Sequence, residues 1–301
     1  HPQDILNNGH IDNNIRMAIK YGIDPIMAIQ MATINVANCY NLKTIGAIAP
    51  GYKADIVVVD NLQDFNVLKV FKDGKLVGEN KKFLCDLTKS DSSSVTNTVQ
   101  IGKITKEDLE INIKDNKANV IGLLPHNLVT EKLVRNVDTK DGKFEFNKNV
   151  DILKLVVIER HTNKKSIGIG LVENFKLKNG AIASTVAHDS HNIIVVGDND
   201  EDIINAVDEI KRIGGGLAIS SNNEILDSLS LPIAGLMSDK DINFVSEKLD
   251  SMLEVAYEQL SVSKDIEPFM TLAFLALPVI PHIKITDKGL FDVDKFEFIQ
   301  V

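Results

Sequence analysis

Apolar and polar positions along this chain follow two periods, one typical of helices and one typical of strands. Apolar residues recur at helical spacing twice within residues 1–42, and the first run ends at Gly22. The second run has Asp24 as its N-cap and Pro25 at its first helical position, and it continues through Val36. We therefore expect two helices in this region, each with an apolar face that must pack against something larger.

Between residues 45 and 88 the apolar positions change to the spacing of strands. We expect two short strands, the second of them buried, followed by a hairpin: 45–52, 54–60 and 67–77. Asp73 and Gly74 would form the hairpin turn, since this pair suits a type I′ turn. The pattern predicts a small β-unit after the two helices.

Residues 89–98 are polar, with three consecutive serines, and predict an exposed linker at a domain boundary. Beyond this linker, residues 99–301 mix the two periods. Strands and a hairpin are expected at 118–124, 153–159, 180–187, 193–197 and 217–226. Two amphipathic helices are expected, one over 200–213 and one that is capped by Ser238 and extends through Leu260. The predicted fold class is therefore α+β, in two domains.

A compact polar segment, His188 to Asn192, separates two of these expected strands. Polar groups between buried strands are costly unless each finds a partner, so the segment is either a closed hydrogen-bond network or a binding place. Histidine and aspartate together can accept protons, donate them or hold a metal. We therefore take His188, Asp189 and His191 as candidate catalytic residues. The structural alternative is a turn that fixes two strands.

A second polar group follows the strand expected at 153–159. Adjacent residues of a strand point to opposite faces, so Glu159 and His161 can share one face while Arg160 takes the other. We take Glu159 and His161 as candidate substrate-binding residues, with a structural role as the alternative. His126 is expected to be a loop residue rather than a ligand.

Composition narrows the function classes. The chain has 301 residues, of which 44% are apolar, enough for two domains with cores of their own. Its net charge of -9 leaves no basic excess to bind nucleic-acid phosphates. Two cysteines cannot form a disulfide framework, which fits a reducing cytoplasm, and the longest apolar run, 272–280, is too short to span a bilayer. We expect a cytoplasmic protein without nucleic-acid or membrane partners.

Two sets of segments resemble known families. Residues 46–60, G-x-I-x-P-G-x-K-A-D-I-V-V-V-D, resemble the strand motif that closes amidohydrolase-superfamily enzymes, where a small β-sandwich lies beside a metal-bearing TIM barrel. Residues 1–12 and four later segments resemble the C-terminal region of the adenine deaminase family: 159–161, 180–192, 231–238 and 286–290. These segments follow the family's order along the whole chain.

This resemblance implies a domain plan and a reaction. The expected parts are the terminal helices of a TIM-barrel domain, part of the β-sandwich, a linker and the family's C-terminal α+β domain: 1–44, 45–88, 89–98 and 99–301. The family hydrolyses adenine to hypoxanthine and ammonia with a metal-activated hydroxide. Its ligands for a divalent metal (manganese, iron or zinc) lie on barrel strands, which would precede His1. Because the chain starts at His1 rather than Met, we expect a C-terminal part that binds no metal by itself and is inactive alone.

The resemblance also implies partners. Adenine would be the substrate of the full-length enzyme, which is expected to be a homo-oligomer. In the functional interpretation, the loop from His188 to His191 covers the barrel mouth of the same or a neighbouring subunit. There an imidazole held by Asp189 moves a proton or contacts the purine edge. Two other hypotheses remain open: a non-catalytic assembly or binding module, and an amidohydrolase acting on another cyclic amide or amidine.

Overall fold

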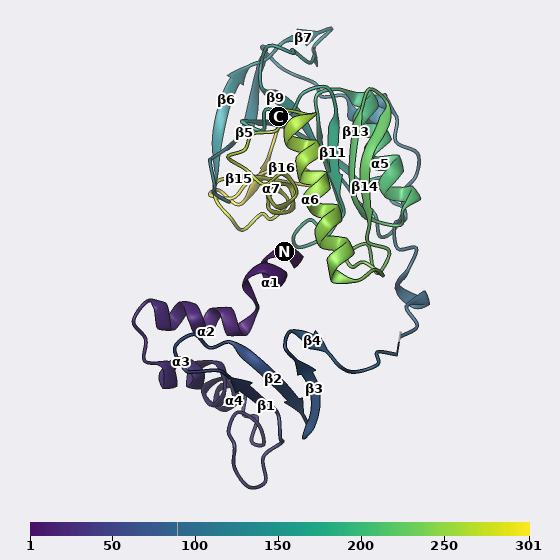
Figure 1. Cartoon of the computed structure of the whole chain (residues 1–301). Helices are drawn as coiled ribbons and strands as arrows, with labels where there is room; N and C mark the ends of the chain where they lie inside the picture. The colour runs from purple at the N-terminus through teal and green to yellow at the C-terminus, as the bar shows by residue number, and fades with distance from the viewer. Residues whose placement is uncertain (89) are drawn as a thin grey trace. The chain divides into compact units, whose positions relative to one another are not determined.

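The computed structural model describes residues 1–88 and 90–301 and shows two compact units, His1–Ser90 and Asp91–Val301 (Figure 1). The division falls within the segment expected to be the linker. Lys89, which belongs to that expected linker, lies outside the described residues.

The segment that opens the second unit is attached to it by hydrogen bonds. The carbonyl of Val95 accepts a hydrogen bond from the main-chain nitrogen of Ala234 at 2.6 Å. The hydroxyl of Thr98 accepts one from Arg160 at 3.3 Å. The short 3-10 helix η1, Ser93–Val95, lies in this segment. The second part of the expected linker is therefore held on the second unit.

The first unit contains four helices where the sequence predicted two. Asp24 accepts a hydrogen bond from the main-chain nitrogen of Met27 at 3.1 Å, which confirms the predicted N-cap. The helix that it begins is interrupted at Thr33, where φ is -130° and ψ is -96°. The Thr33 hydroxyl donates to the carbonyl of Ile29 at 2.6 Å, and a new helix starts at the next residue. The helices are α1 Pro2–Asn8, α2 Ile11–Lys20, α3 Pro25–Ala32 and α4 Ile34–Cys39.

A four-stranded antiparallel sheet completes the first unit, in the order β1-β2-β3-β4. Asp73 and Gly74 both have positive φ, 48° and 77°, so the predicted type I′ hairpin turn is confirmed. Residues 45–52 form no strand, contrary to the prediction, because Gly46 turns the chain against α4 with a φ of 91°. The strand predicted as buried has two exposed middle residues. The strands are β1 Ile56–Val59, β2 Val67–Lys72, β3 Lys75–Glu79 and β4 Lys82–Phe83.

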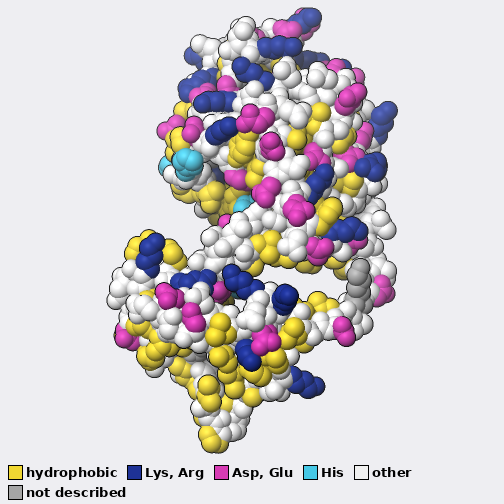
Figure 2. All heavy atoms as spheres, viewed as in Figure 1, with side chains coloured by type: hydrophobic (Ala, Val, Ile, Leu, Met, Phe, Trp, Pro, Cys, Tyr) yellow, Lys and Arg dark blue, Asp and Glu magenta, His cyan; other side chains and the backbone are white. Residues whose placement is uncertain are grey.

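The first unit has a small core and many exposed apolar side chains. Its buried core residues are Ile15, Ile19, Ala28 and Phe65. Figure 2 shows apolar atoms spread over the surface of this unit, and those on its helices include Ile5, Leu6, Ile11, Met17, Ile26, Met27, Met31 and Val36. Contiguous exposed apolar patches are typical of surfaces that bind a protein, a membrane or a ligand.

The second unit is built on an eight-stranded sheet in the order β14-β13-β11-β12-β9-β10-β5-β6. Neighbouring strands are antiparallel, except that β10 and β5 are parallel. The strands are β5 Lys117–Leu123, β6 Thr130–Asn136, β9 Ile152–Ile158, β10 Ile167–Glu173, β11 Ala181–Ser184, β12 Ile193–Gly197, β13 Gly216–Ser221 and β14 Glu224–Ser230.

Smaller elements surround this sheet. The helices are α5 Asp200–Arg212, α6 Ile242–Glu258, α7 Pro268–Leu275 and the 3-10 helix η2 Lys106–Leu109. A two-stranded ribbon and a three-stranded sheet are formed by β7 Thr139–Lys140, β8 Lys143–Phe144, β15 Ile283–Thr286, β16 Gly289–Asp292 and β17 Glu297–Ile299.

The central strands are buried on both faces. Along β12, Ile193 and Val195 pack with α5, whereas Ile194 and Val196 pack with α6 and α7 on the other face. Figure 1 shows these helices on opposite sides of the sheet. Because strand side chains alternate between faces, a strand covered on both sides reads as a continuous apolar run. The unit is therefore a mixed helix-and-sheet domain, as the sequence predicted.

The long helix α6 begins at a different cap from the predicted one. The carboxylate of Asp241 accepts hydrogen bonds from the main-chain nitrogens of Asn243 at 2.9 Å and Phe244 at 3.1 Å. Ser238 instead accepts a hydrogen bond from the main-chain nitrogen of Lys240 at 3.0 Å, before the helix starts. The prediction of Ser238 as the cap is wrong, because the residue directly before the first helical turn already supplies a carboxylate.

Candidate functional site

Strand pairing brings the two sets of candidate residues together. Residues 188–192, which we name the His loop, complete the connection between the antiparallel neighbours β11 and β12. β12 also pairs with β9, and Ile193 lies opposite Ile158. Glu159 to His161 follow β9 directly, so they lie beside the His loop. Residues far apart in the sequence thus meet at the same end of three central strands.

His191 is tied to the main chain of its own loop. Its ring nitrogen Nδ1 accepts a hydrogen bond from the main-chain nitrogen of Ala187 at 3.3 Å. A nitrogen that accepts cannot carry a proton, so this contact favours the neutral imidazole with its proton on Nε2. Burial above all, followed by electrostatic interaction with the nearby His188 and Arg160, lowers the pKa of His191, while Asp189 opposes the shift. The ring is therefore a neutral donor at physiological pH.

His188 is half-buried and held by packing. Its ring lies 5.5 Å from that of His191 and 4.8 Å from that of Phe274 in α7, measured between centroids. Its main-chain nitrogen donates to the carbonyl of Ala273 at 2.9 Å. Within residues 1–88 and 90–301, the structure gives no hydrogen bond to the His188 ring nitrogens or to the exposed carboxylate of Asp189. The expected imidazole held by Asp189 is thus not formed, and both groups remain available to a ligand.

Glu159 uses its carboxylate to build a local turn. Its oxygens accept hydrogen bonds from the main-chain nitrogens of His161 at 2.6 Å and Thr162 at 3.0 Å, and from the Thr162 hydroxyl at 2.8 Å. Burial by itself would raise the pKa of Glu159, but these hydrogen bonds outweigh burial and lower it. The exposed His161 donates from Nε2 to the carbonyl of Ser190 at 2.8 Å, so it joins this turn to the His loop.

Arg160 lies at the centre of the site, and sequence reasoning did not recognise it. Its side chain is only 1% exposed. The guanidinium donates to the carbonyl of His191 at 2.5 Å, the carbonyl of Ala234 at 3.0 Å and the hydroxyl of Thr98 at 3.3 Å. Burial lowers the pKa of Arg160. The sequence did contain one sign of its importance. Arg160 is a charged residue between two candidate residues, and the alternation of a strand directs it to the opposite face.

A second missed group closes the far side of the His loop. The Asn192 side chain donates to Asp287 Oδ1 at 3.4 Å, and the Ser166 hydroxyl donates to Asp287 Oδ2 at 2.8 Å. Asn192 is 3% exposed, and its Oδ1 has no hydrogen-bond partner in the part of the chain that the structure describes. Asp287 thus connects the His loop to the turn between β15 and β16.

The side chains present here do not fit a divalent metal. Among the described residues, no three His, Cys, Asp or Glu side chains are placed so that they could hold a metal ion. A catalytic metal of the kind used by amidohydrolases needs several such ligands converging on one point. The three imidazoles of the site are therefore not placed as a metal-ligand set with any other described residue.

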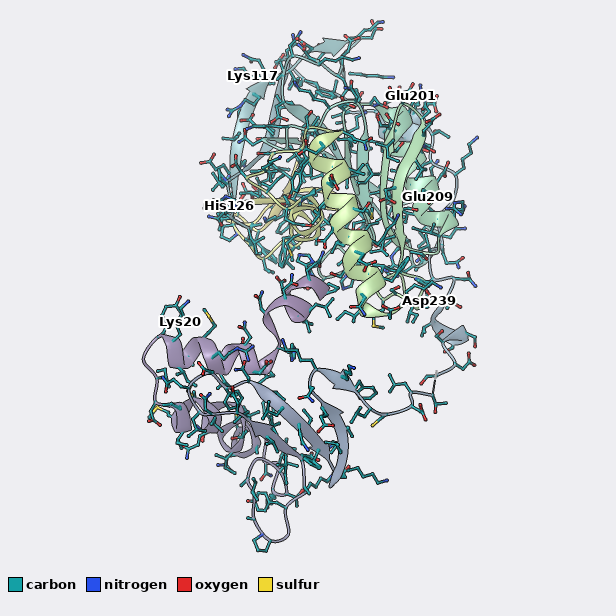
Figure 3. The ribbon with its side chains drawn as sticks, viewed as in Figure 1. Lys20, Lys117, His126, Glu201, Glu209 and Asp239 are labelled. Carbon is teal, nitrogen blue, oxygen red and sulfur yellow. The ribbon has the colours of Figure 1, made fainter. Side chains whose placement is uncertain are left out.

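Other candidates lie away from the His loop. His126 is on the loop after β5 (Figure 3), where its main-chain nitrogen donates to the carbonyl of Asp265 at 2.9 Å. A cavity of about 490 Å³ is bounded by Ile152 and Asp198, at the opposite ends of β9 and β12 from the His loop. This cavity is therefore separate from the candidate site. No helix in the described ranges has both the length and the apolar character needed to cross a membrane.

Comparisons with known proteins identify two regions. Residues 127–297 match the adenine deaminase C-terminal domain, and residues 5–77 match the amidohydrolase family. The chain is 53% identical over 300 residues to an adenine deaminase of Clostridium acetobutylicum. The matched region covers 99% of this chain and 53% of that protein. It is 50% identical over 301 residues to adenine deaminase 2 of Carboxydothermus hydrogenoformans, covering 100% of this chain and 53% of that protein.

A third relative agrees with these two. The adenine deaminase of Nitratidesulfovibrio vulgaris is 47% identical over 300 residues, covering 100% of this chain and 52% of that protein. The chain spans about half the length of the curated relatives it matches. The resemblance found in the sequence is confirmed: this chain belongs to the adenine deaminase family, and it carries the family's C-terminal domain.

Proposed function

We propose that this chain is the C-terminal part of a metal-dependent hydrolase that converts adenine and water to hypoxanthine and ammonia. The observation that carries the proposal is the 53% identity to a curated adenine deaminase over 99% of the chain. The amidohydrolase match over residues 5–77 supports the assignment of residues 1–44 to the end of a TIM barrel and of 45–88 to its β-sandwich. The exposed apolar side chains of α1–α4 are consistent with packing against such a barrel.

We further propose that the chain is inactive alone. The reaction needs a divalent metal, with manganese, iron and zinc as the candidates, to supply hydroxide near neutral pH. The described residues offer no ligand set for it. We place the ligands upstream of His1, in the half of the relatives' length that this chain does not cover. We also propose that the full-length enzyme is a cytoplasmic homo-oligomer.

Within this chain, the proposed contact with the reacting purine is His188. Its ring nitrogens make no hydrogen bond to described residues, and its ring faces Phe274, an apolar side chain suited to a flat heterocycle. His191 would contribute a neutral Nε2–H donor, because its Nδ1 is committed to Ala187. Asp189 would act through its charge on the His191 ring, since no hydrogen bond between described residues joins the two groups.

Glu159 and His161 have more limited proposed roles in substrate binding. Glu159 acts through the turn that it holds, since its carboxylate is fully engaged with Thr162 and His161. His161 keeps one ring nitrogen, Nδ1, as an acceptor once Nε2 has donated to Ser190. A substrate N–H could bind to this acceptor.

A structural role for the His loop is the second candidate. Two main-chain carbonyls of the loop favour this role, because they accept hydrogen bonds from neighbouring side chains: Ser190 from His161, and His191 from Arg160. In this interpretation the loop fixes three strand ends and the histidines contact no substrate. Turnover per folded molecule of variants at His188 and His191 would separate the two candidates.

The proposal is tested by comparing two proteins. One is the 301-residue chain, and the other is the form extended upstream to the full length of its relatives, which we call the extended form. Both are incubated with adenine and Mn²⁺, and ammonia release is followed. We expect release from the extended form only. Steady release from the 301-residue chain above a metal-only blank would show that the chain is catalytic without the upstream part.

A further inference from the structure

We propose that Arg160 is the positioning residue of the His loop: its guanidinium, seated over Gly235, fixes the main chain that orients both imidazoles. This inference rests on the role proposed above for His188 and His191. Arg160 itself is buried away from solvent and would not touch the substrate.

The first observation is that a buried cation is hydrogen-bonded to no carboxylate among the described residues, although the charge of the adjacent Glu159 lies near it. Arg160 is 1% exposed, and its hydrogen-bond partners are two carbonyls and one hydroxyl. No described carboxylate forms an ion pair with it, because both oxygens of the adjacent Glu159 are turned toward Thr162. Burying such a charge costs several kcal/mol, and an apolar side chain of similar volume would avoid that cost. Stability alone does not account for an arginine here.

The second observation is that the three acceptors come from three separate segments. The guanidinium joins the His loop through the carbonyl of His191, the turn after β14 through that of Ala234, and the opening segment of the unit through Thr98. The planar fork of arginine can reach three directions at fixed angles, which the single ammonium of lysine cannot reproduce. Arg160 therefore sets the distance between these segments.

The third observation is the seat beneath the guanidinium. Gly235 has a φ of 70°, and a Cβ built there would lie 2.8 Å from Arg160 Nη1 and 3.0 Å from its Cζ. The carbonyl of Gly235 accepts a hydrogen bond of 2.5 Å from the Thr185 hydroxyl, at the base of the His loop. The turn at Ala234 and Gly235 is thus bound by two side chains, Arg160 after β9 and Thr185 before the His loop. Any side chain at Gly235 would displace the guanidinium.

The consequence for the imidazoles is both geometric and electrostatic. With the carbonyl of His191 fixed, its Nδ1 stays within reach of Ala187, and its ring stays against that of His188. The charged groups that face His191 are His188 and Asp189 from its own loop, and Arg160 and His161 from the segment after β9. Asp287, from the turn after β15, reaches the neighbouring Asn192. Of these groups, Arg160 is the one whose charge is permanent and positive.

The test uses the 301-residue chain with nitrogen-15-labelled histidine, whose ring signals are titrated by NMR. In Arg160→Met we expect the pKa of His191 to rise, because a nearby positive charge and an orienting hydrogen bond are both lost. The ring contact between His188 and His191 should weaken in the same spectra. Gly235→Ala should shift the same signals in the same direction, since its Cβ displaces the guanidinium.

Matched variants make the outcome decisive. Arg135→Met removes an arginine that pairs with Glu173 at 2.7 Å on β6 and β10, and it should leave both histidine titrations unchanged. Thr98→Val removes only the longest of the three contacts, 3.3 Å, and keeps the test available if Arg160→Met fails to fold. Unchanged histidine titrations and ring contacts in the folded Arg160, Gly235 and Thr98 variants would overturn the positioning role.

The pH profile of turnover in the extended form separates this inference from the proposed function. A shifted His191 titration together with a shifted pH profile supports both. A shifted titration with unchanged turnover per folded molecule supports the positioning role and removes the His loop from the reaction. An unshifted titration removes the positioning role whatever the activity.

Discussion

The imidazole rings of His188 and His191 meet edge to face, with their centroids 5.5 Å apart and an angle of 68° between their planes. Aromatic rings favour this arrangement because the positive edge of one meets the negative face of the other. Among the described residues, the His191 ring accepts a main-chain hydrogen bond, from Ala187, and the His188 ring has none. The two histidines therefore contribute differently to the loop, and substitution can separate their roles.

Replacing His188 by asparagine in the extended form should lower turnover by about 10²-fold, the scale of a lost proton-transfer group. Its thermal midpoint should stay close to that of the unsubstituted protein, because no hydrogen bond of the His188 ring is lost. His191→Asn should lower both quantities, since the main-chain nitrogen of Ala187 loses its acceptor, at roughly 1–3 kcal/mol. Turnover and thermal midpoint are measured on the same samples.

His126→Asn is the matched control for this pair, because His126 lies on the loop after β5, away from the His loop, and its main-chain nitrogen donates to the carbonyl of Asp265. It should leave turnover unchanged. If His188→Asn turns over normally per folded molecule, then His188 has no part in the reaction, and the His loop is a structural connection between β11 and β12.

The central strands could be predicted because their burial is visible in the local sequence. β9, β11 and β12 are covered on both faces, so their residues are almost all apolar or small. β6 was not predicted, because Glu131, Lys132 and Arg135 interrupt it. It lies at the edge of the sheet, and its membership depends on pairing with β5, a long-range contact. The strand predicted at 45–52 does not form, because Gly46 turns the chain against α4, and this turn depends on tertiary packing.

The candidate site could be predicted only in part, for a related reason. His188 and His191 stand out because polar residues interrupt two apolar runs. The role of Arg160 depends on acceptors at Thr98, His191 and Ala234, which no local pattern connects. Glu159 resembled a binding residue, but its hydrogen bonds to the next residues form a turn, which depends on backbone geometry beyond the strand end.

The cap of α6 provides a stability test of the second unit. Asp241→Ala should lower the free energy of unfolding by about 1 kcal/mol, because two main-chain nitrogens in the first turn lose their acceptor. Ser238→Ala is the matched control and should change it by less than about 0.5 kcal/mol, since the Ser238 hydroxyl accepts an exposed hydrogen bond from the main chain of Lys240, before the helix starts. Urea unfolding of both variants measures the difference. A larger effect at Ser238 than at Asp241 would place the cap where the sequence first predicted it.

The boundary between the two units should be the first place where a protease cuts. Leu84 and Leu87 are 50% and 79% exposed and lie outside any helix or strand. Exposed irregular segments enter a protease site readily, whereas residues 91–98 are attached to the second unit. Brief digestion with thermolysin should therefore release a fragment that begins between residues 84 and 92, as identified by mass spectrometry. A first cut within Asp200–Arg212 would contradict the proposed boundary.

Lys284 offers a prediction about stability and pH that is independent of the His loop. The side chain is fully buried on β15, and its ammonium donates to one carbonyl, that of Leu128, at 2.8 Å. Burial lowers the pKa of Lys284 to about 8, from an ordinary value of 10.5. The pKa of Lys284 is lower in the folded chain than in the unfolded chain. Its positive charge therefore destabilises the folded state, and this cost has its full size below about pH 8. This cost fades as the pH rises toward about 10.5.

Replacing Lys284 by methionine should therefore stabilise the chain near pH 7. The full shift corresponds to about 3 kcal/mol, from which the lost hydrogen bond to Leu128 subtracts about 1, so we expect a gain of about 2 kcal/mol in urea unfolding. The gain should shrink or reverse near pH 10, where the wild-type lysine is neutral in the folded state and keeps its hydrogen bond. Lys288→Met, on the exposed turn after β15, is the control and should show no such pH dependence. An equal effect of Lys284→Met at both pH values would mean that Lys284 is not charged in the folded chain near pH 7.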